Sequence, residues 1–177
     1  MRHSLALLCS SLIILLILTA VNRPGGALVS KDPAALRPPE DYMKIAIQAA
    51  DAAGNPFGSV IVNGNGEYVA AGNSVRKDGP TAHAEMNAIW KLKELDYDDP
   101  SELTLYTSAE PCSMCMSAII WAGIPKVVFG MPIEGISRYY NQIQLSAKEV
   151  AEKSWYEIEI NGPLMEKECT VLFEKFN

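Results

Sequence analysis

Two short motifs constrain this chain more than any other feature of its sequence. His83-Ala84-Glu85 opens one predicted helix and Pro111-Cys112-Ser113-Met114-Cys115 opens the next. Cysteines three residues apart in a first helical turn lie on one face of the helix. Each predicted helix follows a strand or loop, and both N-termini can therefore point to the same end of a sheet. The motifs predict a fold that brings one imidazole and two thiols together.

These three groups form a donor set that zinc prefers. Thiolates bind zinc at about 2.3 Å and an imidazole nitrogen at about 2.1 Å, and three protein ligands leave a fourth position for water, as in catalytic sites. We therefore predict one zinc ion per chain, with His83, Cys112 and Cys115 as its ligands. Glu85 lies two residues beyond the histidine, near the metal without having to bind it, and can carry protons.

Other interpretations of the cysteine pair explain less of the sequence. A lone C-x-x-C is more often a redox pair or half of a structural zinc site. A redox pair would leave the histidine and glutamate unexplained, and a structural site lacks a fourth partner, because Cys169 is predicted to be a core residue of the last helix. His83 is the only histidine in residues 31–177, so a zinc-bound His83 leaves no histidine for a Ser-His-Asp catalytic triad in that range.

The periodicity of apolar residues and the turn signals predict an α/β fold with the element order α-β-β-α-β-α-β-(α)-β-α. The Asn63-Gly64-Asn65-Gly66 segment is typical of a tight hairpin, which forces one antiparallel pair into the sheet. We expect a three-layer α-β-α sandwich with a mixed five-stranded sheet. The predicted strands are 57–62, 67–72, 103–106, 126–129 and 156–160, a loop spans 74–81, and the predicted helices are 39–53, 82–95, 111–121, 146–154 and 164–176.

The N-terminal segment 1–30 is predicted to be a targeting or anchoring segment. The stretch from Leu5 to Val21 is mostly apolar, and as a helix it would span about 26 Å, slightly less than a hydrocarbon core. Small residues at cleavage-like spacing follow, which favours a secretory signal peptide over an uncleaved membrane anchor. We expect residues 1–30 to be this leader, 31–39 a proline-rich linker and 40–177 the zinc-dependent domain, exported or anchored outside the cytoplasm.

The charge of the chain argues against broad binding to nucleic acid. The formal net charge is −6, and without the segment 1–30, which holds two arginines and no acid, it becomes 13 minus 21, or −8. A nucleic-acid binder needs basic groups to neutralise phosphates. Of the four cysteines, Cys9 lies in the leader, which excludes a scaffold of several disulfides.

The motifs and their surroundings resemble the cytidine/deoxycytidylate deaminase superfamily, for which H-x-E followed by P-C-x-x-C is a signature. The segments Asn55–Val62, Ala71–Asn73, Pro80–Glu85 and Leu105–Cys115 resemble its purine-acting branch, which includes guanine and tRNA adenosine deaminases. The resemblance covers residues 40–177 and implies that Glu85 is the proton shuttle. The resemblance also implies that Asn73 reads the base, that the backbone N–H of Ala84 contacts the substrate, and that Phe57 and Trp121 form apolar walls of the substrate site. Without the resemblance, Asn73 would be interpreted as a turn residue, and Phe57 and Trp121 as residues of the hydrophobic core.

The implied reaction is hydrolytic deamination of a free nucleobase or nucleoside with release of ammonia. We expect a guanine-like purine as the substrate. A tRNA adenosine deaminase is the alternative, because residues 164–176 resemble that branch, and Glu134 is the sole acid in 132–141, where guanine deaminase has an acidic residue. A secreted nucleic-acid deaminase and a non-catalytic zinc module that binds a partner remain as further alternatives. Relatives lead us to expect a homodimer, with membrane contact only through an uncleaved leader.

Overall fold

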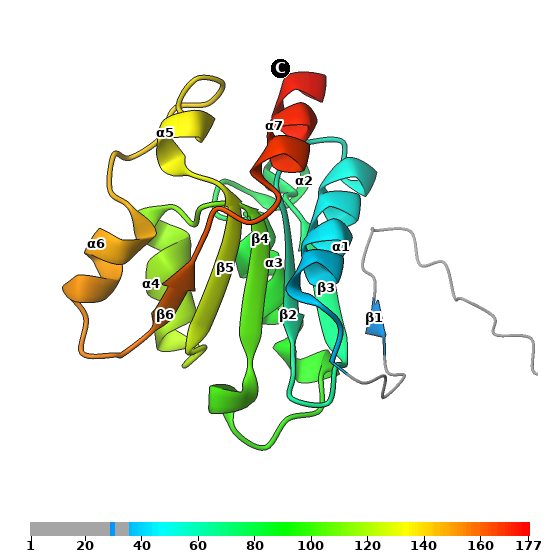
Figure 1. Ribbon diagram of the computed structural model, residues 1–177, viewed down its shortest axis with the longest axis vertical. Helices are drawn as coiled ribbons and strands as arrows, with labels where there is room; N and C mark the ends of the chain where they lie inside the picture. The colour runs from blue at the N-terminus through cyan, green and yellow to red at the C-terminus, as the bar shows by residue number, and fades with distance from the viewer. Residues whose placement is uncertain (1–28, 31–35) are drawn as a thin grey trace, which may run out of the picture.

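A mixed sheet of six strands organises the molecule (Figure 1). The computed structural model describes residues 29–30 and 36–177. The sheet has the order β1-β3-β2-β4-β5-β6, in which β2 pairs antiparallel with both β3 and β4, whereas β4, β5 and β6 run parallel. The strands are Val29–Ser30 (β1), Gly58–Val62 (β2), Tyr68–Gly72 (β3), Thr104–Ala109 (β4), Lys126–Met131 (β5) and Glu159–Asn161 (β6).

Helices cover both faces of this sheet, which confirms the predicted three-layer sandwich (Figure 1). Helices α1 (Pro39–Ala52) and α7 (Glu166–Lys175) pack on one face. Helices α3 (Ala84–Trp90), α4 (Ser113–Trp121) and α6 (Ala147–Glu152) belong to the other. The short elements are α2 (Val75–Asp78), α5 (Ile133–Ile136) and the 3₁₀ turns η1 (Leu92–Glu94) and η2 (Pro100–Glu102).

Alternate residues of the central strands supply two separate hydrophobic cores. Val60 of β2 and Tyr106 of β4 pack with the α1 and α7 side, where Phe173 is fully buried. Their neighbours Ile61 and Leu105 pack with the α3 and α4 side. Strands covered on both faces are largely apolar, and the buried hydroxyl groups of Ser59, Thr107 and Ser108 in these two strands are hydrogen-bonded.

The five predicted strands are present, and the structure adds a sixth at the edge. β1 pairs antiparallel with β3 through Val29–Ser30, at the end of the range expected for the leader. The rest of the leader and residues 31–35 lie outside the described residues. Within the described part of the chain, no helix combines the length and the hydropathy needed to cross a membrane.

Several predicted element boundaries differ from the structure. The helix predicted over 82–95 is observed as α3 followed by the 3₁₀ turn η1. It begins later than predicted because the Asn87 amide donates hydrogen bonds to the carbonyl oxygens of Gly72 and Ala82, which holds the segment before the helix extended. The loop predicted over 74–81 contains the single turn α2. The last helix starts at Glu166, since Met165 has a left-handed φ of 55°.

Helix α1 lies so close to the hairpin that glycine is required beneath it. A Cβ atom on Gly58 would overlap the carbonyl oxygen of Ala46 and approach the Ala50 nitrogen to 2.6 Å. We expect Gly58→Ala to lower the free energy of unfolding by about 1–3 kcal/mol or more, measured by urea denaturation. The control is Gly64→Ala, whose nearest neighbouring atom is 3.5 Å from the new Cβ. Equal stability of the two variants would contradict this packing.

Candidate metal centre and its cavity

The two motifs meet at one edge of the sheet because of the strand directions. Since β2 is antiparallel to both β3 and β4, these two strands run parallel to each other. The helices that follow them therefore begin at the same edge. His83 is the N-cap residue of α3 and Cys112 that of α4, each with an extended backbone. Cys115 follows in the first turn of α4 and is fully buried.

The three predicted ligands form one cluster. The Nδ1 atom of His83 lies 3.7 Å from the Sγ of Cys112 and 3.5 Å from the Sγ of Cys115. All three donor atoms lie within 4.8 Å of one another. Tetrahedral zinc with ordinary bond lengths would separate nitrogen and sulfur ligands by about 3.6 Å. The two nitrogen–sulfur distances of the cluster therefore match those of a zinc site.

Hydrogen bonds within the cluster redistribute its protons. The contact with the Cys115 side chain lowers the pKa of Cys112 to about 4. The same contact, together with burial, raises the pKa of Cys115 above its ordinary value. The hydrogen bond to Cys112 raises the pKa of His83. Zinc binds thiolate and neutral imidazole, so metal binding would displace the protons that these groups share.

Glu85 stands beside this cluster and is not part of it. Its side chain is buried, with 6% exposure, and its carboxylate is absent from the group of donor atoms found among the described residues. Burial raises the pKa of Glu85 to about 7. A carboxyl group with a pKa near neutrality can both accept and release a proton, as an acid–base catalyst must.

A cavity of about 290 Å³ opens onto His83, Glu85 and Cys112. Phe57 and Asn73, both predicted from the sequence, line it as well. The Phe57 and Tyr140 rings pack edge to face, with their centroids 5.1 Å apart. The Asn73 Oδ1 accepts a hydrogen bond from the backbone N–H of Val75, which leaves its amide NH₂ group for a ligand. The further lining residues are Val75, Ala109, Glu110, Ile136, Asn141 and Gln142.

The structure corrects the position predicted for Trp121. This residue is 76% exposed and lines a different hollow between α4 and α6, where its ring lies 4.7 Å from that of Trp155. On a helix, residues four apart share a face. Trp121 therefore lies with Ser113 and Ser117 on the side of α4 that turns away from the sheet. The buried Ala84 opens α3, and its backbone contact with substrate stays a prediction.

Sequence reasoning missed Glu110, Tyr140 and their neighbours in the cavity wall. Glu110 could have been noticed, because a charged residue directly after a buried strand and before the Pro111-Cys112 pair needs a partner. The segment that carries Tyr140, Asn141 and Gln142 has no comparable signal, since its place depends on contacts distant in sequence.

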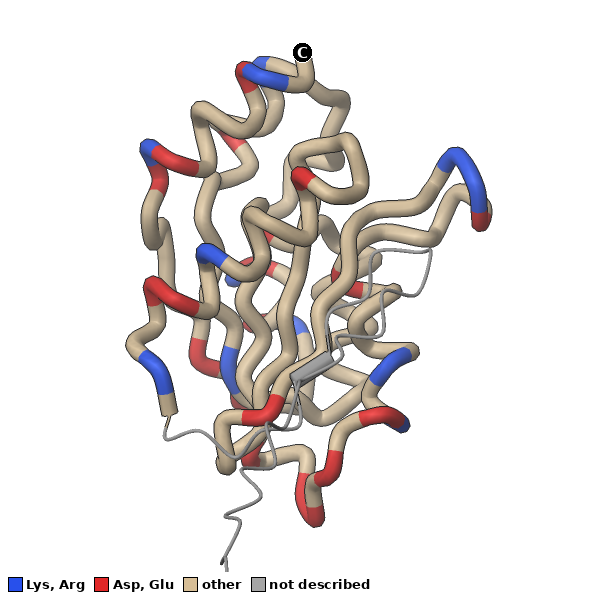
Figure 2. The backbone as a smooth tube through the Cα atoms, turned by 90° about the vertical axis from the view of Figure 1, so that its right-hand side faces the viewer, with Lys and Arg blue, Asp and Glu red and all other residues tan. Residues whose placement is uncertain are grey.

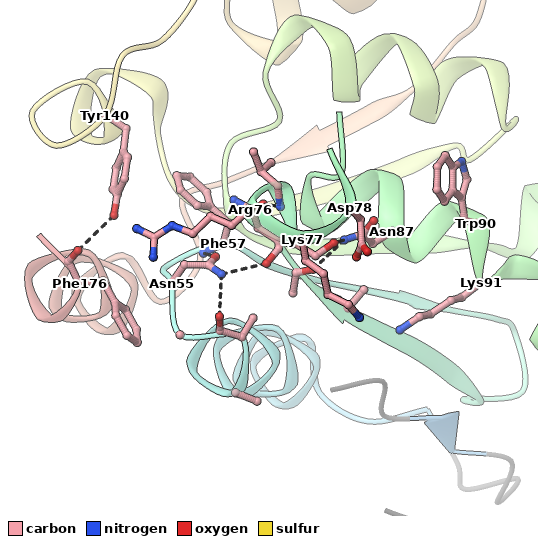
Figure 3. Close-up of a pocket in the computed structure, with 18 of the residues that line it drawn as sticks. Asn55, Phe57, Arg76, Lys77, Asp78, Asn87, Trp90, Lys91, Tyr140 and Phe176 are labelled. Carbon is pink, nitrogen blue, oxygen red and sulfur yellow. Dashed lines mark hydrogen bonds between the residues drawn. The ribbon is translucent and has the colours of Figure 1, made fainter. Parts of the chain in front are cut away.

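A larger recess of about 800 Å³ adjoins the cavity and shares Phe57, Asn73, Val75 and Tyr140 with it. Figure 3 shows the side chains of Arg76, Lys77 and Lys91 around this recess. The Asn55 amide donates to the carbonyl oxygen of Asn73 at 3.0 Å and so ties the recess to the cavity wall.

The chain matches one family model and several characterised proteins. Residues 37–131, which contain both motifs, match the cytidine and deoxycytidylate deaminase zinc-binding region. A probable cytosine deaminase of Schizosaccharomyces pombe is 33% identical over 156 residues, covering 84% of this chain and 94% of the relative.

Two Bacillus subtilis proteins are also similar. Its tRNA-specific adenosine deaminase is 34% identical over 147 residues, or 77% of this chain and 87% of the relative. Its guanine deaminase is 49% identical over 79 residues, which are 43% of this chain and 49% of the relative. Among solved structures, a guanine deaminase of Nitrosomonas europaea shares the fold with a TM-score of 0.69 at 24% identity, covering 82% of this chain and 88% of that one.

The cluster predicts a specific pattern of metal loss. We expect purified protein to hold one zinc ion per chain, and Cys112→Ser to lose most of it, because a hydroxyl is a much poorer zinc ligand than a thiolate. Cys169→Ser is the matched control, since Cys169 is a buried thiol outside the cluster. Metal content is measured by mass spectrometry. Folded wild-type protein without zinc, or full zinc content in Cys112→Ser, would refute the site.

Proposed function

The chain belongs to the cytidine and deoxycytidylate deaminase family, and we propose on that premise that it removes the amino group of a free nucleobase or nucleoside by hydrolysis. A guanine-like purine is the first substrate to test. One observation carries the proposal: the buried Glu85 carboxyl faces the same cavity as His83 and Cys112, with the free amide group of Asn73 in its wall.

The residues of the chain divide the work of the reaction. His83, Cys112 and Cys115 would hold a zinc ion, and the chemistry that zinc would supply there is that of a Lewis acid, which lowers the pKa of water towards neutrality. Glu85 takes a proton from the attacking water and passes it to the ring nitrogen beside the amino-bearing carbon. It then takes the proton of the new hydroxyl group and delivers it to the leaving amine, so that the carbonyl forms as the C–N bond breaks, and water is consumed with release of ammonia. The pKa of Glu85 near 7 suits both directions of transfer.

The cavity walls orient the base. Phe57 offers an aromatic surface against which a planar ring can pack. The free amide NH₂ of Asn73 is a donor and would pair with an acceptor on the base, such as a ring nitrogen or carbonyl oxygen. These two contacts hold the reacting carbon near Glu85 while leaving the carboxyl free to move protons.

The acidity of the chain supports a small substrate over nucleic acid. The formal net charge is −6, and Figure 2 shows acidic residues interspersed with basic ones along the helices and loops. A protein that binds RNA needs a basic footprint. Export from the cytoplasm, which we propose from the leader, would also separate the enzyme from tRNA.

The tRNA alternative keeps one structural argument in its favour. The basic residues that line the recess beside the cavity are Arg76, Lys77, Lys91 and Lys93, and the acidic ones are Asp78 and Glu94. Figure 3 labels Arg76, Lys77, Asp78 and Lys91 among them. This local excess of positive charge could contact phosphates that flank a base in the cavity. Deamination of an adenosine in tRNA is therefore the second candidate function.

Ammonia release from a panel of substrates separates the candidates. Purified protein is assayed with guanine, guanosine, adenine, adenosine and cytosine, and with an RNA stem–loop that carries adenosine in its loop. We expect one of the free bases or nucleosides to react and the RNA to remain unchanged. Reaction of the RNA alone would replace the small-molecule proposal by the tRNA one, and no ammonia from any substrate would contradict both.

Glu85→Gln tests the proton carrier. An amide of nearly equal size keeps the cavity filled but cannot accept or release the proton, so turnover should fall by more than the roughly 10²–10⁴-fold typical of one acid–base group. Zinc content and thermal stability should stay near those of the wild type, because Glu85 is not in the ligand cluster. Glu174→Gln, an exposed change on α7, serves as the control. Near-normal turnover in Glu85→Gln would refute this mechanism.

A further inference from the structure

Glu110 is a buried carboxylate that the proposed chemistry leaves without a role. It follows β4 directly, has only 7% exposure and lines the catalytic cavity. Its backbone N–H donates to the carbonyl oxygen of Met131 at 2.8 Å and so continues the pairing of β4 with β5. The backbone of Glu110 is therefore fixed by the sheet, two residues before the zinc ligand Cys112.

Each carboxylate oxygen of Glu110 accepts a hydrogen bond from a different part of the chain. Oε2 accepts from the backbone N–H of Ile133 at 2.9 Å, and Oε1 accepts from that of Ala147 at 2.8 Å. Ile133 opens α5 and Ala147 opens α6. Hydrogen bonds to an ionised acceptor are roughly twice as strong as neutral ones. One side chain thus connects the sheet to the starts of two helices.

The two bonded residues are the ends of a closed loop over the cavity. The backbone N–H of the first residue of 133–147 donates to one carboxylate oxygen of Glu110, and the backbone N–H of the last residue donates to the other. Ile136, Tyr140, Asn141 and Gln142 lie between these ends, and all four line the cavity. Loops of this length with adjoining ends are packed by their own side chains, and Glu110, which lies outside this loop, adds a hydrogen bond at each of its ends. The position of this cavity wall therefore depends on Glu110 as well as on the packing of Tyr140 against Phe57 and Phe173.

We propose that Glu110 is a positioning residue that fixes residues 133–147 over the catalytic cavity and thereby sets the affinity of the enzyme for its substrate. This inference rests on the proposed deaminase function, because affinity is read through turnover of the base. Glutamate suits the task, since aspartate is one methylene shorter and glutamine replaces one acceptor oxygen with an NH₂ group that would face a backbone donor.

Glu110→Gln separates positioning from catalysis. In zinc-loaded protein, the KM for the base that the wild type deaminates fastest should rise about ten-fold or more, with kcat changed far less. Hydrogen exchange should accelerate in residues 133–147 and stay unchanged in α1. Zinc content should remain at the wild-type value. The control is Glu174→Gln, an exposed carboxylate on α7 outside this segment, which should change none of these quantities.

Ala147→Pro tests the same contact from the other side and keeps the proposal testable if Glu110→Gln does not fold. Proline removes the N–H that Glu110 binds but is tolerated at a first helical position, and the extended backbone of Ser146 suits a following proline. We expect the same rise in KM and the same local increase in exchange.

The outcomes distinguish failure of this inference from failure of the proposed function. Unchanged exchange in residues 133–147 in either variant overturns the positioning role, whether or not the protein deaminates any base. Faster exchange without a change in KM refutes the link to affinity. A fall in kcat with constant KM assigns Glu110 to the chemical step instead. Exchange that rises equally throughout the domain reduces Glu110 to a general stabilising residue.

Discussion

The candidate site depends on the position of β2 in the sheet. Because β2 is hydrogen-bonded antiparallel to β3 on one side and to β4 on the other, the two outer strands of this trio end at the same edge. The helices that follow them start there, and their first residues supply the histidine and the two cysteines. A parallel pairing of β2 with either neighbour would place the motifs at opposite ends of the sheet.

The zinc cluster and the strands could be predicted from the sequence for different physical reasons. Few arrangements of His83, Cys112 and Cys115 explain both motifs at once, so the chemistry limits the choices. The central strands are covered on both faces, and such strands are rich in apolar residues, which makes short apolar stretches such as Val60–Val62 visible in the sequence. Helix ends were less predictable, because contacts such as those of the Asn87 amide decide where α3 begins.

The cavity wall could not be derived in the same way. Tyr140 reaches it only because the chain between α5 and α6 folds back over the edge of the sheet, and its ring packs against that of Phe57, which lies far away in the sequence. Trp121 lies neither in the cavity wall that the family resemblance implies nor in the core, where it was expected without that resemblance, because its side chain is 76% exposed beside Ser113 and Ser117.

The distribution of tryptophan has a consequence for spectroscopy. All three tryptophans of the chain lie on the surface, with exposures of 63% for Trp90, 76% for Trp121 and 69% for Trp155. The indole emission of the folded protein should therefore resemble that of indole in water and shift little on denaturation. Circular dichroism is the better reporter of unfolding. Trp90, which lines the recess beside the cavity, is instead placed to report the arrival of a quenching ligand.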